Sequence, residues 1–310
     1  MAKPLKIGTR GSPLALAQTE LFIAMLLEKH THLREDNAVE IVKIVTSGDR
    51  IQDRALSEVG GKGLFTKEIE DALLSGEIDC AVHSMKDMPT ELPHGLSIPC
   101  LLPREDVRDA FFSRDQKTLA ELPAGSVVGT SSLRRQAIVL AQRPDLKVVT
   151  FRGNVGTRLK KLEDGVVDAT LLAVAGLKRL GQAHLIQHIL EPEDMLPAVA
   201  QGAIGIETRS DDAATKKLLE PVHCHITELR VTAERSFLAV MDGSCKTPLA
   251  ALLSVPDPHH RARFDALSAS EDGKKVWRVS YMMNVANTGD AKSIGVAAGA
   301  DIKKQIEKKP

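Results

Sequence analysis

The sequence uses the same junction twice: a short apolar strand, then Gly-Thr and hydroxyl residues, then the start of a helix. The first copy is Ile7-Gly8-Thr9-Arg10-Gly11-Ser12, and the second is Val128-Gly129-Thr130-Ser131-Ser132. Pro13 follows Ser12, as expected for an N-cap serine and the first residue of a helix. Because the free N–H groups at a helix N-terminus bind anions, each junction can serve as an anion site. Two ordinary serine caps would give the same pattern.

Short apolar runs alternate with helical patterns through the first two thirds of the chain. Such alternation is typical of an α/β protein with a mostly parallel sheet. One helix is expected from Pro13 to about Lys29, and another is expected to be capped by Thr66 and to stop at Gly76. The other expected strands and helices are strands at 5–9, 39–45, 80–82, 126–130, 147–151 and 167–174, and helices at 132–142, 155–164 and up to about 180.

At 310 residues the chain is too long for one small core, so more than one domain is expected. The strand–helix alternation ends near Val222. A helix at 228–241, strand-like pieces and a C-terminal helix follow, and they indicate a smaller α+β domain. The expected division is lobe 1 at 1–100, completed by about 198–221, then lobe 2 at 101–197, then the C-terminal domain at 222–310.

The composition argues against a nucleic-acid or membrane partner. Lys plus Arg and Asp plus Glu both number 41, and aromatic residues make up only 3%. A polyanion binder usually has a basic excess, and base stacking needs aromatic side chains. No apolar run is long enough to span a bilayer, and Arg10, Gln18 and Glu20 interrupt the segment that most resembles a signal peptide. We therefore expect a cytoplasmic protein and, since nothing demands more, a monomer.

Arginines gather at the expected strand-to-helix turns. Arg134 and Arg135 fall in the first turn of a helix, where a cation opposes the helix dipole unless an anion docks. Arg152 and Arg158 flank a glycine-containing turn, and Arg10 lies in the first junction. The planar guanidinium binds carboxylate or phosphate through two parallel hydrogen bonds. Because no nucleotide-binding glycine motif is present, we expect a ligand with several separate carboxylates or phosphates.

The segment His83-Ser84-Met85-Lys86-Asp87 follows an apolar strand and is stopped by Pro89. In α/β proteins ligands bind at the carboxyl ends of strands, so this loop has the position of a site. The alternative is that Lys86 and Asp87 are ordinary solvated charges.

Cys245 lies among Gly, Ser, Lys, Thr and Pro residues, which predicts an exposed loop rather than a core. It is therefore a candidate nucleophile or attachment point, although a lone cysteine is more often a buried apolar residue. Cys80, in an apolar strand, is expected to be inert. His223 and His225 suggest a metal, but no further ligand lies at zinc-like spacing, so we expect none.

Together these pieces resemble one family over roughly residues 5–250. Its ordered motifs here are Gly8-Thr9-Arg10-Gly11-Ser12-Pro13-Leu14-Ala15, Gly60-Gly61-Lys62-Gly63-Leu64-Phe65, His83-Ser84-Met85-Lys86-Asp87, Gly129-Thr130-Ser131-Ser132-Leu133-Arg134-Arg135, Arg152-Gly153-Asn154-Val155-Gly156-Thr157-Arg158, Ala175-Gly176-Leu177-Lys178-Arg179-Leu180 and Gln201-Gly202-Ala203. The sequence resembles hydroxymethylbilane synthase, also called porphobilinogen deaminase. One departure is Ser244, where many members have Gly before the cysteine.

The resemblance implies an enzyme that joins four porphobilinogen molecules head to tail, releases four ammonia and yields hydroxymethylbilane in tetrapyrrole and haem biosynthesis. It implies two periplasmic-binding-protein-like lobes around a cleft, plus a small α+β domain that presents Cys245. That cysteine would carry a dipyrromethane cofactor through a thioether. Each pyrrole bears an acetate and a propionate, which matches the polycarboxylate that the arginines predict.

The resemblance also implies roles for individual residues. Asp87 would be catalytic, facing the pyrrole nitrogens and stabilising the cationic azafulvene that forms when ammonia leaves. Besides Cys245, the cofactor would be bound by Ser84, Lys86, Thr130, Ser131, Ser132, Arg134, Arg135 and Gly153. The substrate would be bound by Arg10, Ser12, Phe65, Arg152, Arg158, Arg179 and Gln201.

Two other classes remain open on the residues alone. A non-catalytic two-lobed anion-binding protein would share the arginines, but it has no use for an exposed Cys245. A lysine-imine enzyme built on Lys86 would need an apolar setting to lower the amine pKa, and the adjacent Asp87 opposes this. If the resemblance to porphobilinogen deaminase holds, replacing Arg134, Arg135 or Arg152 by Leu should cripple chain initiation or extension and leave the fold intact.

Overall fold

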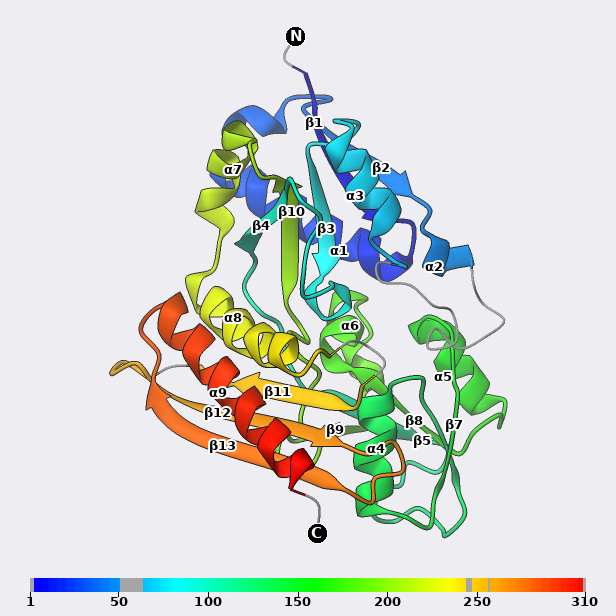
Figure 1. Ribbon diagram of the computed structural model, residues 1–310. Helices are drawn as coiled ribbons and strands as arrows, with labels where there is room; N and C mark the ends of the chain where they lie inside the picture. The colour runs from blue at the N-terminus through cyan, green and yellow to red at the C-terminus, as the bar shows by residue number, and fades with distance from the viewer. Residues whose placement is uncertain (1–2, 51–63, 244–246, 256, 309–310) are drawn as a thin grey trace. The chain divides into compact units, whose positions relative to one another are not determined.

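The computed structural model describes residues 3–50, 64–243, 247–255 and 257–308 (Figure 1). Its contacts divide the chain into two units: unit 1 comprises Met1–Arg104 and Ala203–Thr227, and unit 2 comprises Glu105–Gly202 and Glu228–Pro310. Each unit is thus assembled from two separate stretches of the chain. The predicted three-domain division stays a prediction. No helix in the described part of the chain is long and apolar enough to cross a membrane.

Unit 1 contains a five-stranded mixed sheet with the order β2-β1-β3-β10-β4. The strands β2, β1 and β3 are parallel, and β10 runs antiparallel to both of its neighbours. The elements of unit 1 are β1 (Leu5–Arg10), α1 (Pro13–Lys29), the 3-10 turn η1 (Thr31–Arg34), β2 (Val39–Ile44), α2 (Ser47–Arg50), α3 (Lys67–Leu74), β3 (Cys80–Ser84), η2 (Met85–Asp87), β4 (Leu96–Leu101), β10 (Ile204–Arg209), α7 (Ala213–Leu219) and η4 (Glu220–Val222).

Both faces of this sheet are buried, as alternation along β3 shows. Cys80 and Val82 point into one cluster with Phe22 of α1, whereas Ala81 between them belongs to a cluster with Leu73 of α3. Two apolar faces explain why β3 reads as an unbroken apolar run rather than as an alternating one.

The predicted start of α1 is confirmed. Ser12 is the N-cap, its Oγ accepts a hydrogen bond from the Ala15 N–H at 3.3 Å, and Pro13 is the first helical residue. The predicted end at Lys29 is also confirmed. Thr66 precedes α3 as expected but makes no side-chain capping hydrogen bond, so that part of the prediction is wrong.

Unit 2 contains a second five-stranded sheet, with the order β7-β6-β8-β5-β9. This sheet is mixed, which corrects the expectation of a mostly parallel one: β6 is parallel to β7 and β8, but β5 is antiparallel to β8 and β9. Its elements are β5 (Asp109–Ser113), β6 (Val127–Gly129), α4 (Leu133–Gln142), β7 (Lys147–Val149), α5 (Val155–Glu163), β8 (Ala169–Ala173), α6 (Val174–Arg179), η3 (Ala183–Leu185) and β9 (His188–Leu190).

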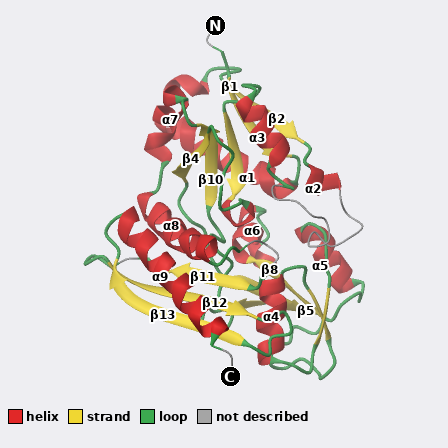
Figure 2. Cartoon of the chain, in the orientation of Figure 1, coloured by secondary structure: helices red, strands yellow, loops and turns green. Residues whose placement is uncertain are grey.

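The C-terminal part of unit 2 is an antiparallel sheet of three strands, covered by two helices (Figure 2). Its elements are α8 (His225–Val240), β11 (Leu249–Leu253), β12 (Arg261–Ala269), β13 (Val276–Asn284) and α9 (Thr288–Glu307). Helices α8 and α9 approach closely because α9 carries glycines at the contact. A Cβ at Gly295 would lie 2.1 Å from the Ala233 carbonyl oxygen, and one at Gly299 would lie 2.6 Å from Val240 Cγ1.

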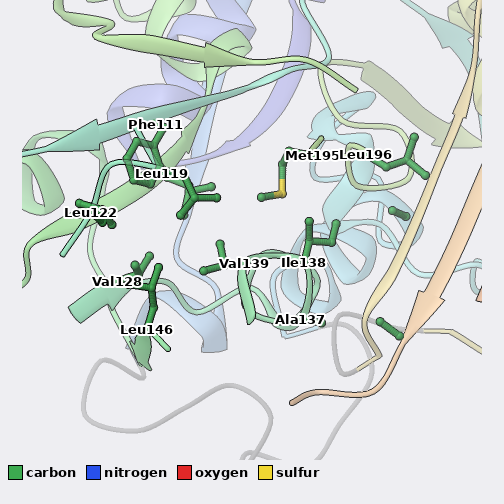
Figure 3. Close-up of a cluster of buried hydrophobic side chains, with 14 of the residues drawn as sticks. Phe111, Leu119, Leu122, Val128, Ala137, Ile138, Val139, Leu146, Met195 and Leu196 are labelled. Atoms are coloured by element: carbon green, nitrogen blue, oxygen red, sulfur yellow. The ribbon is translucent and has the colours of Figure 1, made fainter. Parts of the chain in front are cut away.

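The two sheets of unit 2 share one hydrophobic core. Phe111 of β5, Ile138 of α4 and Leu196 lie in the same buried cluster as Leu267 of β12 (Figure 3). The turn between β12 and β13 also packs on α4, since a Cβ at Gly273 would lie 2.4 Å from the Ala141 nitrogen. Lobe 2 and the C-terminal sheet therefore stabilise one another by burial of common apolar surface.

Candidate active site

In unit 1, strands far apart in sequence bring the predicted residues to one edge of the sheet. Since β1 and β3 are parallel and paired at Gly8 and Ala81, they end at the same edge. Arg10 ends β1 and Ser12 follows it, whereas Ser84 ends β3 and Lys86 and Asp87 follow it. The antiparallel β10 starts there, with Ile204 opposite Ser84. This edge has the position at which α/β sheets bind ligands.

Buried methionines hold the loop that carries Lys86 and Asp87. Met85 is buried, its N–H donates to the Ala203 carbonyl at 3.0 Å, and the Met88 N–H returns to the Met85 carbonyl at 3.3 Å. A Cβ at Gly205 would lie 2.2 Å from Met85 Sδ, so this position needs glycine. Between the two anchors, Lys86 is half-buried and Asp87 is exposed. The carboxylate of Asp87 is therefore accessible on a fixed turn.

His83 and Ser84, which precede Lys86, each contact a buried side chain that sequence analysis did not single out. Gln18, buried on α1, donates from Nε2 to Ser84 Oγ at 2.8 Å. His83 Nε2 lies 2.9 Å from Glu207 Oε2 on β10, and both side chains are buried. Nothing local in the sequence signals either partner, since Gln18 is 66 residues from Ser84 and Glu207 is 124 residues from His83.

Arg10 and Phe65, both predicted to bind substrate, lie together in unit 1. The Arg10 Cζ is 4.2 Å from the centroid of the Phe65 ring, a cation–π contact. The ring in turn fills the space beside Gly48, where a Cβ would lie 2.3 Å from Phe65 Cε1. The aromatic side chain thus orients the guanidinium of Arg10, the last residue of β1.

In unit 2 the equivalent edge collects residues from four strands. β6, β7 and β8 are parallel and end there, and the antiparallel β5 starts there, with Asp109 paired to Ala173. The 130–135 segment follows β6, Arg152 and Gly153 follow β7, and Arg179 ends α6, the helix after β8. The predicted residues that directly follow β6 and β7 are therefore neighbours at one edge, and Arg179 lies at the far end of the helix that starts there.

The hydroxyls at this edge shape the turn after β6. Thr130 Oγ1 accepts from the Ser132 N–H at 3.1 Å, Ser131 Oγ donates to the Phe151 carbonyl at 2.9 Å, and Ser132 Oγ caps α4 by accepting from the Arg135 N–H at 3.4 Å. The predicted cap at Ser132 is confirmed. The assisting roles predicted for these three hydroxyls toward a ligand stay predictions.

Arg134 and Arg135 have an anion within the chain, which revises the inference drawn from their place on the helix. Asp109 accepts from Arg134 Nη2 through Oδ2 and from Arg135 Nη2 through Oδ1, both at 2.7 Å. The other guanidinium ends donate to the carbonyls of Leu196 at 2.8 Å and Leu171 at 2.9 Å. The cation that opposes the helix dipole is thus compensated by Asp109 itself.

The electrostatics of this cluster follow from its burial. Burial would raise the pKa of Asp109, but the two guanidiniums outweigh it and hold the pKa well below its usual range. Burial also lowers the pKa of Arg134. Gln201 belongs to the same cluster: its Nε2 donates to Asp109 Oδ1 at 3.0 Å and to the Val107 carbonyl at 2.6 Å. Sequence analysis placed Gln201 on a substrate and missed Asp109 altogether.

The remaining arginines leave this edge rich in positive charge. Burial, and then the charges of Arg135 and Arg152, lower the pKa of Arg158 to about 10. Burial lowers that of Arg179 to about 10 as well. Arg158 Nε donates to the Gly153 carbonyl at 2.9 Å, and Arg179 Nη2 donates to the Gly202 carbonyl at 2.7 Å. A pKa lowered in this way marks cations that would be stabilised by an anionic ligand.

Some buried arginine N–H groups of unit 2 also have no hydrogen-bond acceptor. Among the described residues, the Nε–H groups of Arg134, Arg135 and Arg179 are buried and have no hydrogen-bond partner. Native proteins satisfy nearly all of their buried polar groups, so such atoms need an explanation. The contacts within the described residues therefore leave these three donors unused.

The predicted attachment point, Cys245, lies outside the described residues. The described residues around it place the segment between α8 and β11, where Gly243 is packed against Leu238 and Leu249. Cys100 is buried, and burial raises the pKa of its thiol to about 12; burial raises that of Cys80 still further. The prediction that Cys80 is an inert thiol therefore agrees with its surroundings.

His223 lies on unit 1, just before α8, and its Nδ1 accepts from the Leu101 N–H at 3.2 Å. One of its ring nitrogens is thus engaged by the backbone. His223, His225 and Glu228 nevertheless each offer a possible ligand atom within 4.8 Å of the others, so the expectation that no third ligand is available is wrong.

Comparison with known proteins decides the family. Residues 5–217 match the model described as porphobilinogen deaminase, dipyromethane cofactor binding domain, and residues 228–304 match the C-terminal domain of the same enzyme. The chain belongs to the porphobilinogen deaminase family. It is 55% identical over 303 residues to the porphobilinogen deaminase of Paracoccus denitrificans, covering 98% of this chain and 93% of the relative. It is 57% identical over 276 residues to the chloroplastic enzyme of Oryza sativa, covering 89% and 77%.

Family membership makes porphobilinogen deaminase, or hydroxymethylbilane synthase, the activity of the chain, and dipyrromethane its cofactor. The expected enzyme class and α/β fold are confirmed, and the two alternative classes are wrong. Solved structures are more distant. The periplasmic aliphatic sulphonate binding protein of Escherichia coli is 15% identical, with a TM-score of 0.42 over 78% of this chain and 71% of that one. A YaeC-family lipoprotein of Enterococcus faecalis is 14% identical, with a TM-score of 0.44 over 72% and 92%.

Proposed function

We propose that the chain joins four porphobilinogen molecules head to tail, with arginines of unit 2 on the pyrrole carboxylates and Asp87 at the reacting pyrrole. The observation that carries this proposal is the excess of cationic donors at the carboxyl edge of the unit 2 sheet. Burial lowers the pKa of both Arg158 and Arg179 to about 10; the charges of Arg135 and Arg152 add to this at Arg158, and Glu105 offsets it only in part at Arg179.

The residues at this edge fit a dipyrromethane. Such a group carries two acetates and two propionates, and the buried Nε–H donors of Arg134, Arg135 and Arg179 have no acceptors of their own. We assign these arginines, with Lys86, Ser84, Gly153 and the hydroxyls of 130–132, to its carboxylates, and Cys245 to its thioether. When bound, the group supplies the free pyrrole position from which the chain grows.

Asp87 would stabilise positive charge on the substrate. When ammonia leaves, porphobilinogen becomes a conjugated cation, and coupling then requires loss of a proton from a pyrrole carbon. An exposed carboxylate on a turn fixed by Met85 and Met88 can meet the cation without first reorganising. Its accessibility also permits it to accept a proton from the pyrrole and to hand it to water.

Substrate carboxylates would be bound by a second group of residues. In unit 1 the carboxylates would be bound by Ser12 and by Arg10, which Phe65 orients. In unit 2 they would be bound by Arg152, Arg158 and Arg179. Gln201 is assigned differently from the sequence-based expectation, since its amide nitrogen already donates to Asp109 and to a backbone carbonyl. It supports the arginines from within the chain.

Intact mass spectrometry of the freshly purified protein tests the proposal. We expect a mass that exceeds the sequence by two pyrrole units, with a peptide map that places the addition on Cys245. Cys245→Ser should abolish the addition, whereas Cys224→Ser, at a half-buried cysteine, should retain it. An active preparation with the unmodified mass would contradict the proposed attachment. A monomeric state and a cytoplasmic location stay predictions; one of the relatives is chloroplastic.

A further inference from the structure

Asp109 is a buried carboxylate at the carboxyl edge of the unit 2 sheet, and none of the family motifs includes it. It is the first residue of β5 and is 0% exposed. Three side-chain donors converge on it: Arg134 Nη2 on Oδ2, and Arg135 Nη2 and Gln201 Nε2 on Oδ1, at 2.7, 2.7 and 3.0 Å. One residue therefore orients two guanidiniums and a carboxamide.

A purely stabilising ion cluster would look different. Burying ions costs desolvation, and replacing such clusters by apolar side chains is often neutral or stabilising, so burial alone gives little reason to keep this one. A cluster built for stability would also satisfy all of its donors. Here the Nη groups are engaged by Asp109 and by the carbonyls of Leu196 and Leu171, but the Nε–H groups of both arginines are buried without a partner in the described part of the chain.

The position of Asp109 in the fold also indicates a role beyond stability. Because β5 is antiparallel to β8, its first residue lies where β6 and β8 end, beside the arginines that the ligand would use. At the other end of β5, Ser113 is paired with Ala169, next to Asp168, whose carboxylate accepts from the Val127 N–H at 2.7 Å. Asp168, just before β8, offers a half-buried carboxylate at the opposite edge of the sheet, away from Arg134 and Arg135.

We propose that Asp109 is a positioning residue for the carboxylate-binding arginines: it anchors the ends of Arg134 and Arg135, so that both guanidiniums are fixed before the pyrrole carboxylates bind. This inference rests on the proposed function. Preorganisation lowers the ordering cost of ligand binding, because long arginine side chains otherwise lose rotamer freedom on binding. Asp109 also neutralises one of the two charges, which permits both cations to be buried side by side.

The test compares Asp109→Asn with Asp168→Asn, each studied at a temperature well below its own melting point. The amide of Asn keeps the size of the side chain but removes the charge and one acceptor. We expect Asp109→Asn to lower cofactor occupancy, measured by intact mass, at least threefold. In the fraction that carries cofactor, we expect the KM for porphobilinogen to rise at least tenfold while kcat falls less than threefold. Asp168→Asn should lower the melting temperature and leave both occupancy and KM within twofold.

If Asp109→Asn fails to fold, Asp109→Glu takes its place, because it keeps the charge and moves the carboxylate by one methylene. A folded Asp109 variant with wild-type occupancy and KM would overturn the proposal, as would Asp168→Asn producing the same changes. The proposed function fails separately: it fails if the wild-type protein itself carries no two-pyrrole addition, whatever the variants do.

Discussion

Replacing Arg134 by Leu should destabilise unit 2 substantially, because the guanidinium is 4% exposed and bonded inside the protein. The substitution removes the 2.7 Å bond to Asp109 and the 2.8 Å bond to the Leu196 carbonyl. A hydrogen bond to a charged group contributes about 1.5–3 kcal/mol, and a stranded buried acceptor costs about 1–3 kcal/mol. The expected loss is about 3–5 kcal/mol, the range found when one partner of a buried ion pair is removed.

The single Trp, Trp277, lies on β13 of unit 2, so its fluorescence follows the unfolding of that unit. For a unit of this size, the expected loss lowers the melting temperature by roughly 6–20 °C. Arg114→Leu is the matched control, because Arg114 is exposed in the same unit and should change the free energy of unfolding by less than about 0.5 kcal/mol. An Arg134→Leu protein that melts within about 2 °C of wild type would refute the reasoning. We thus revise the sequence-based expectation that this substitution leaves the fold undisturbed.

Three further predictions concern single substitutions. Asp87→Asn should lower the single-turnover rate of ammonia release at least a hundredfold (about 2.7 kcal/mol), whereas Asp87→Glu should keep some activity; an Asn variant within tenfold of wild type would rule out charge stabilisation. Gly205→Ala should displace Met85 and the turn that bears Asp87, costing about 1–3 kcal/mol of stability and reducing kcat; unchanged kcat would contradict the anchoring role of Met85. Since the folded-state pKa of Asp109 is depressed, its contribution to stability is present above the unfolded pKa of about 3.9 and is lost as the pH falls below it; acid titration of Trp277 fluorescence should show a weaker dependence in Asp109→Asn.

Local signals predicted the elements that local chemistry decides. Ser12 and Pro13 indicated the start of α1 because a cap and a first-turn proline act within four residues. Ser132 did the same for α4. The strand end at Arg10 and the turn that carries Lys86 were predicted because the apolar runs before them are short and clearly bounded.

What sequence reasoning missed depends on pairing across the fold. Asp109 reads as an ordinary charge before an apolar run, and only the antiparallel register of β5 with β8 brings it to Arg134, 25 residues away in the chain. The same strand made the sheet mixed rather than mostly parallel. Gln18 and Glu207 escaped for a similar reason, since their partners, Ser84 and His83, are 66 and 124 residues distant.

The discontinuous build of unit 1 has a consequence for synthesis on the ribosome. Strand β10 lies between β3 and β4 in the sheet, yet about a hundred residues of unit 2 separate it from β4 in the chain. At roughly 5–20 residues per second, β3 and β4 wait about 5–20 s for the strand that joins them. During that interval each has an unpaired edge on which a neighbouring nascent chain could add a strand. Translation speed through residues 105–202 therefore sets how long this chain is exposed to misassembly.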